Sequence, residues 1–156
     1  FNMMALRQIG PLVIREYGVS RMLTIYTLGG VFGFVLSFLA GVRFTIGASA
    51  AVCGLIGAIL YYGKSRGGIY GRNLFSQIGG WAITIFVFGL IVPGINNWGH
   101  GGGMAAGALL GFLLGYQEKK RENIRHKFLG ASCVIITALV LSWAALSSIF
   151  YVFVLR

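Results

Sequence analysis

The chain has 156 residues, of which 57% are hydrophobic and only 10% are charged. A water-soluble domain carries roughly 25% charged residues, so this composition argues against one and indicates an integral, multi-pass membrane protein. The formal net charge is +10, but the cations lie in short runs between apolar segments, where membrane topology places them. We therefore expect contact with a lipid bilayer and no binding of nucleic acid.

Six apolar segments follow one another along the chain and predict an all-α, polytopic bundle of transmembrane helices. They cover residues 1–14, 22–40, 49–62, 78–92, 99–116 and 128–155. The first is too short to cross a hydrocarbon core of about 30 Å, and no loop precedes it. We therefore expect the chain to be N-terminally truncated and to begin partway through a helix.

The third segment is also short and opens with a run of small residues that contains one hydroxyl, that of Ser49. A helix from Ser49 to Tyr62 would rise roughly 21 Å at about 1.5 Å per residue, so it begins inside the membrane. A polar residue at this depth is tolerated only within protein or beside a water-filled cavity. Taken alone, Ser49 also fits an ordinary seam of small residues between packed helices.

Charge alternates between the connections. Cations concentrate in or beside the first, third and fifth connections, namely Arg15, Arg21, Lys64, Arg66, Arg72, Lys119, Lys120, Arg121, Arg125 and Lys127. The second and fourth connections hold only Arg43. This is the positive-inside pattern, so we expect the first, third and fifth connections to be cytoplasmic, with His126 solvated in the last of them.

Segments one, three and five then run from outside to inside, and each has a polar residue at or near its start. These residues are Asn2, Ser49 and His100, and the topology places them at similar depth near the extracytoplasmic face. An ionisable residue in a membrane segment is by default a hypothesis of function. The alternative for His100 is a helix cap or a pore-lining histidine.

Glycines recur once per helical turn along the fifth segment, at Gly99, Gly103, Gly107, Gly111 and Gly115. Such a series lets a neighbouring backbone approach closely. The third segment also presents a face of small residues, so we expect these two helices to pack together. That packing would bring the serine and the histidine at their starts within hydrogen-bond reach.

A serine beside a histidine suggests nucleophilic catalysis, in which the imidazole takes the serine proton. The chain has no aspartate, and its three acids, Glu16, Glu118 and Glu122, all fall on the cytoplasmic side. A hydrolase of this sequence would therefore use a Ser–His dyad. Two separated histidines and no acidic cluster offer no ligand set for a metal, and we expect no cofactor.

Four stretches resemble the rhomboid family of intramembrane serine proteases, in the same order and with the same sidedness, over the chain up to about Tyr116. Residues 47–50 (GASA) resemble its GxSG motif, residues 97–102 (NWGHGG) its histidine-bearing helix, and residues 1–6 (FNMMAL) the end of its HxxxN element. Residues 21–26, with the glycine pair at 29–30, resemble the following helix.

The resemblance implies a role for each candidate residue. Ser49 would be the nucleophile and His100 the general base, while the Ser49 backbone N–H and the Asn2 side chain would donate to the oxyanion. Residues 93–97 would form a mobile cap over the site. The substrates would be single-pass transmembrane proteins cut near their extracytoplasmic ends, and the location a bacterial inner membrane with the site toward the extracytoplasmic side.

The chain departs from the family pattern at three places. Ala50 stands where the family usually has glycine, and Cys53 stands where an aromatic side chain often packs on the catalytic histidine. The histidine expected four residues before Asn2 would precede Phe1. We expect a partial catalytic core over residues 1–117, which lacks the first helix and its preceding loop. A basic cytoplasmic linker over 118–127 and an additional helix over 128–156 would follow, and the chain would insert without cleaving by itself.

Two alternatives to a protease are open at this point. One is a catalytically inactive rhomboid-like protein that binds transmembrane helices without cutting them. The other is a small transporter or channel with a polar site at the membrane midplane, although no repeated half is visible in the sequence.

Overall fold

The computed structural model describes residues 1–42 and 44–154, and all regular secondary structure there is α-helical. The helices are α1 (Asn2–Tyr17), α2 (Val19–Leu39), α3 (Ser49–Arg66), α4 (Gly68–Ile91), α5 (Asn97–Leu114) and α6 (Ile124–Val154). The predicted all-α bundle is confirmed. Arg43, Leu155 and Arg156, which belong to the expected second connection and to the end of the last segment, lie outside the described residues.

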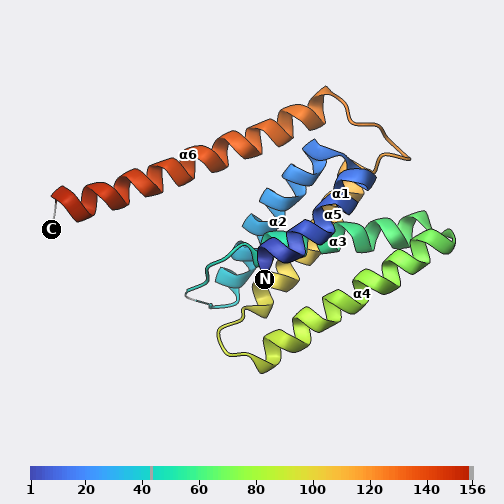
Figure 1. Cartoon of the computed structure of the whole chain (residues 1–156), viewed down its shortest axis with the longest axis horizontal. Coiled ribbons are helices and arrows are strands. Elements are labelled where there is room, and N and C mark those ends of the chain that lie inside the picture. Colours follow the sequence, from blue (N-terminus) through green and yellow to red (C-terminus); the bar gives the residue numbers. More distant parts are fainter. Residues whose placement is uncertain (43, 155–156) are drawn as a thin grey trace.

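Helix α3 forms the centre of the bundle and contacts α1, α2, α4 and α5 (Figure 1). Twelve of its residues are buried, on every side of the helix, as expected of a helix enclosed by protein. Helix α6 extends away from the other five (Figure 1). Within the described residues, three helices are long and apolar enough to cross a membrane: Val19–Leu39, Gly68–Ile91 and Ile124–Phe153.

The fourth helix begins ten residues earlier than the predicted segment, at Gly68 instead of residue 78. The connection from α3 is therefore Gly67 alone, and Arg72 lies within α4. Gly67 and Gly68 both have φ near +66°, a conformation that glycine adopts without steric cost. This pair turns the chain back sharply enough for α4 to pack against α3 from its first turn.

The predicted close packing of the third and fifth segments is confirmed, because the α3 and α5 backbones touch at glycines. A methyl group at Gly107 would overlap the Gly54 carbonyl oxygen and lie 2.7 Å from the Gly54 Cα. A methyl group at Gly57 would likewise lie 2.7 Å from the carbonyl carbon of Met104. Helix α2 joins the same contact, since Gly29 faces the backbone of Gly54.

Tyrosine side chains pack together where α1, α3 and α5 end. The rings of Tyr17, Tyr62 and Tyr116 meet edge to face, with centroids 4.8 to 6.3 Å apart. The Tyr17 hydroxyl donates a 2.8 Å hydrogen bond to the Ala58 carbonyl oxygen, so the polar end of this buried ring has a partner, as buried tyrosines usually do.

The expectation that His126 is solvated is wrong, since this residue is only 5% exposed. The basic segment between α5 and α6 folds back over the start of α2, where it covers the fully buried Arg21. Arg21 donates to the Lys120 carbonyl oxygen (2.7 Å), to the Tyr17 carbonyl oxygen (3.2 Å) and to His126 Nδ1 (3.2 Å). We call this set of contacts the Arg21 cluster; it attaches the first turn of α6 to α2.

Candidate active site

A cavity of about 670 Å³ lies at the end of the bundle where α1, α3 and α5 begin. Asn2, Ser49 and His100 all line it, from these three helices in turn. Part of the wall comes from the C-terminal half of α4, including Thr84 and Phe88. The structure thus gathers the three residues that the sequence selected around one hollow, although no hydrogen bond joins Ser49 to His100 within the part of the chain described.

Ser49 is the first residue of α3 and is half-buried. The chain reaches it through Gly47, whose φ of +112° is a conformation that residues with a Cβ rarely adopt. A backbone N–H in the first turn of a helix has no acceptor within that helix. The start of α3 therefore presents to the cavity both a hydroxyl and an N–H group that can donate to an anion.

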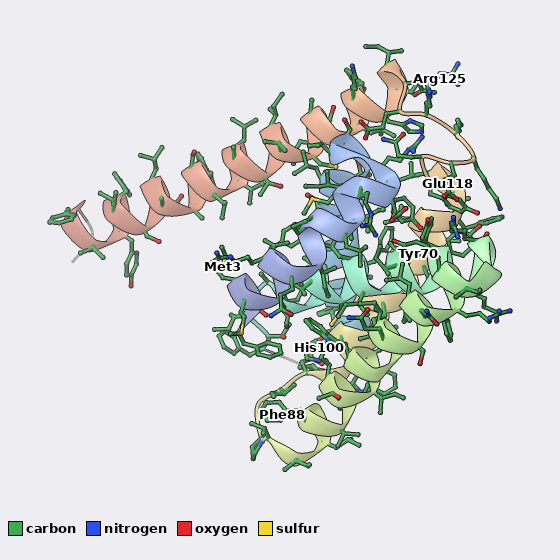
Figure 2. All side chains as sticks on the ribbon, turned by 45° about the vertical axis from the view of Figure 1, so that its right-hand side comes forward. Met3, Tyr70, Phe88, His100, Glu118 and Arg125 are labelled. Carbon is green, nitrogen blue, oxygen red and sulfur yellow. The ribbon has the colours of Figure 1, made fainter. Side chains whose placement is uncertain are left out.

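His100 lies in the first turn of α5 and is 7% exposed. Its Nδ1 is buried without a hydrogen-bond partner among the described residues. The three acids lie at the other end of the bundle, where Glu16 pairs with Arg15 at 2.8 Å and Glu118 with Arg66 at 2.9 Å. Figure 2 shows Glu118 far from His100 and Phe88. Among the described residues, the arrangement offers the imidazole no carboxylate.

The remaining candidate residues lie beside this pair. The Asn2 Nδ2 atom is 4.0 Å from the position that a Cβ would occupy at Gly47, two residues before Ser49. Cys53 follows Ser49 by about one helical turn, lines the same cavity and is 1% exposed. Ala50 points away from the cavity into the contact between α2, α3 and α5, where its methyl group faces Gly33.

Sequence reasoning missed the hydrogen bonds of Asn96, which it placed only within the expected mobile cap. The side-chain oxygen of Asn96, Oδ1, accepts a 3.1 Å hydrogen bond from the Gly99 N–H and caps α5. Its amide nitrogen donates to Ser37 Oγ and to Thr45 Oγ1, the latter at 3.0 Å. Asparagine before a helix is a preferred cap, so the cap was detectable from sequence, whereas the two distant partners were not.

Asn97 makes a further link between the start of α5 and α4. Its side-chain amide donates to the Phe86 carbonyl oxygen at 3.2 Å. Among residues 1–42 and 44–154, no three His, Cys, Asp or Glu side chains gather closely enough to hold a metal ion. The polar groups that line the cavity are hydroxyls, side-chain amides, the thiol of Cys53, the imidazole of His100 and the N–H groups at the start of α3.

The comparisons with known proteins identify the family of the chain. Residues 1–117 match the model of the Rhomboid domain. The chain is similar to rhomboid protease GluP of Bacillus subtilis, with 36% identity over 115 residues that cover 74% of this chain and 23% of that protein. It is also 37% identical over 116 residues to RHOMBOID-like protein 4 of Arabidopsis thaliana, covering 72% of this chain and 29% of that protein.

RHOMBOID-like protein 5 of the same plant is 35% identical over 119 residues, which cover 72% of this chain and 38% of that protein. The chain thus spans between about a quarter and two fifths of the length of these relatives. No solved structure matches it. From the family match over most of its length and from its apolar helical bundle, this chain is an integral membrane protein that belongs to the rhomboid family.

Proposed function

We propose that this protein is an intramembrane serine endopeptidase that cleaves single-pass transmembrane helices near their extracytoplasmic ends. One observation carries the proposal: Ser49 and His100, far apart in sequence, line the same cavity at the starts of two helices whose backbones touch. The curated relative from Bacillus subtilis is named a rhomboid protease, which supports the same reaction class.

In the proposed mechanism, Ser49 Oγ attacks the scissile carbonyl while His100 takes its proton, and His100 then gives that proton to the leaving amine. A water molecule hydrolyses the acyl-enzyme in the second step. The Ser49 backbone N–H and the Asn2 side chain would donate to the oxyanion, and the loss of one such donor typically raises the barrier by about 2.7–4 kcal/mol.

The cavity also suits an unwound peptide within a membrane. A hydrogen-bonded helix hides its carbonyl groups, so the scissile segment has to unwind before Ser49 can attack it. The cavity is lined by the apolar side chains of Ile85 and Phe88 as well as by the polar side chains of Asn2 and Ser49. An extended segment with small side chains would place its backbone against Asn2 and Ser49 and its neighbouring turns in lipid.

We also propose that residues 1–117 form the catalytic core, that the basic segment after it is a cytoplasmic linker, and that α6, which begins at Ile124 and so four residues before the predicted segment, is an additional transmembrane helix. The location we propose is a bacterial inner membrane with the cavity toward the extracytoplasmic side, as the distribution of cations indicates. Fractionation of the source cells and accessibility of single cysteines placed beside Ser49 would test this orientation.

A second candidate function is that of an inactive rhomboid-like protein that binds transmembrane helices. The observation that favours it is the absence of a Ser49–His100 hydrogen bond in the described residues. Such bonds are often long in unliganded enzymes and tighten with substrate, so we place the protease first.

The deciding experiment measures cleavage of a reporter transmembrane substrate in detergent by the protein expressed from its complete gene. We expect cleavage, labelling of Ser49 by a fluorophosphonate, and loss of both in Ser49→Ala. The matched control is Ser147→Ala, which removes an exposed hydroxyl on α6 and should change neither. A folded protein that binds the substrate but shows neither cleavage nor labelling would establish the inactive alternative.

A further inference from the structure

The side chain of Asn96 uses all of its hydrogen-bonding groups, and each bond reaches a different part of the fold. Its oxygen accepts from the Gly99 N–H in the first turn of α5. One amide hydrogen goes to Ser37 Oγ in α2 and the other to Thr45 Oγ1 in the segment before α3. A primary amide has two donor hydrogens, so this one residue joins three elements.

One of these elements carries a proposed reacting group, and another leads directly into the helix that carries the second. The first turn of α5 holds His100, whose backbone N–H donates to the backbone carbonyl oxygen of Asn96 at 3.2 Å. Thr45 lies four residues before Ser49, in the segment that leads into α3. A direct link between Asn96 and Thr45 therefore joins the approach to the serine to the start of the histidine helix.

The third element, α2, provides a fixed support for the other two. Ser37 is fully buried near its end. At Gly33, one turn earlier, a methyl group would lie 2.6 Å from the Gly99 carbonyl oxygen and 2.8 Å from the Ala50 Cβ. Helix α2 thus contacts the starts of both α3 and α5, and Asn96 attaches to it at the same level.

We infer that Asn96 is a positioning residue that holds Ser49 and His100 at their working separation through its bonds to Thr45 and Ser37. This inference rests on the proposed protease function. It goes beyond the cap of α5, because a cap needs only the bond to Gly99. A serine at this position would keep a capping oxygen but is too short to reach both hydroxyls.

The experiment removes the link without touching the cap, the serine or the histidine. Thr45→Val replaces the hydroxyl by a methyl group of similar size, and Thr45→Ser restores the hydroxyl. The matched control is Thr137→Val, because Thr137 is exposed on α6, outside the cavity, and its hydroxyl bonds only within that helix, to the Cys133 carbonyl oxygen at 2.7 Å. Rates of reporter cleavage give kcat and KM, and thermal unfolding in micelles gives stability.

We expect Thr45→Val to lower kcat by roughly tenfold or more with little change in KM, since small displacements of reacting groups can cost up to about a hundredfold. Thr45→Ser and Thr137→Val should cleave like the wild type, and all three variants should unfold near the wild-type temperature. Asn96→Ser should lower kcat at least as far as Thr45→Val, which gives a second, independent test of the link.

Other outcomes overturn the inference in distinguishable ways. If the wild type cleaves and Thr45→Val matches it, Asn96 serves only as a cap, and the proposed function is untouched. If Thr45→Val and Thr137→Val lose kcat equally, the loss does not come from the link between Asn96 and Thr45, and the inference fails. If the wild type does not cleave and Ser49 does not react with the fluorophosphonate, the proposed function fails and leaves no reaction for Asn96 to organise.

Discussion

The contact between α3 and α5 can be tested by adding a single methyl group at Gly107. In Gly107→Ala the new carbon would overlap the Gly54 carbonyl oxygen and lie 2.7 Å from the Gly54 Cα. Nonbonded carbons normally lie about 3.5–4.0 Å apart, so the helices would have to separate by about 1 Å. Neither atom of Gly54 belongs to a side chain that could rotate away.

The expected magnitude follows from two opposing effects. Overpacking a well-packed interior costs about 1–3 kcal/mol, and a rigid backbone contact belongs at the upper end of that range. Replacing glycine by alanine inside a helix recovers about 0.5–1 kcal/mol. We therefore expect Gly107→Ala to lower the free energy of unfolding by about 2 kcal/mol, or the midpoint by roughly 4–8 °C for a chain of this size.

The assay is thermal and denaturant-induced unfolding in detergent micelles, with Gly80→Ala as the matched control. Gly80 lies inside α4, and a methyl group there would meet nothing within 4 Å. This variant should be as stable as the wild type or slightly more stable. Equal stability of Gly107→Ala and Gly80→Ala would refute the backbone contact between α3 and α5.

Three further predictions concern the reacting pair, Cys53 and the Arg21 cluster. Because a reacting pair acts as one unit, Ser49→Ala combined with His100→Ala should cleave no more slowly than either single variant; additive losses in residual rate would contradict the dyad. Cys53→Phe should keep the cleavage rate within about tenfold, or about 1.4 kcal/mol in the barrier, because Cys53 borders open space; a failure to fold would show instead that the residue is tightly packed. Arg21→Met should lower the free energy of unfolding by about 2 kcal/mol or more, since it removes the hydrogen bonds of a charged group. His126→Asn keeps an acceptor for Arg21 and should lower the free energy of unfolding clearly less than His126→Phe does. Equal losses would exclude a role for the 3.2 Å bond between Arg21 and His126 Nδ1.

Much of the site arrangement could be predicted because it depends on features that repeat along the chain. The spacing of glycines such as Gly103 and Gly107 follows the helical turn, so the sequence indicates which face of α5 admits a neighbouring backbone. The alternation of cations fixes the direction of each segment. From these two regularities Asn2, Ser49 and His100 were expected at one end, and all three line the cavity there.

The features that could not be predicted depend on contacts between distant parts of the chain. The polar start of α4 is helical because Gly71 packs on the Gly63 carbonyl oxygen and the Tyr70 hydroxyl donates to Glu16 at 2.7 Å. The spacing of apolar residues along the chain does not indicate contacts with residues this far away in sequence. His126 likewise lies in a strongly basic run and is buried only because the connection folds back over Arg21.

The one-sided attachment of α6 has a mechanical consequence. Its buried and half-buried residues lie between His126 and Cys133, and Gly130 packs so closely on α2 that a methyl group there would be 2.7 Å from the Ser20 carbonyl oxygen. From Val134 to Phe153 every residue is exposed. A helix of 31 residues is about 46 Å long, and α6 is held only near its first turns by that short contact.

Rotation at this contact is magnified along the helix. A tilt of about 5° at Gly130 would sweep the far end through roughly 3 Å, given a rise of about 1.5 Å per residue. The angle between α6 and α2 is therefore set by the close packing of Gly130 on Ser20 together with the Arg21 cluster. A change in either would move the distant end of α6, a helix that contributes no residue to the lining of the cavity at Ser49.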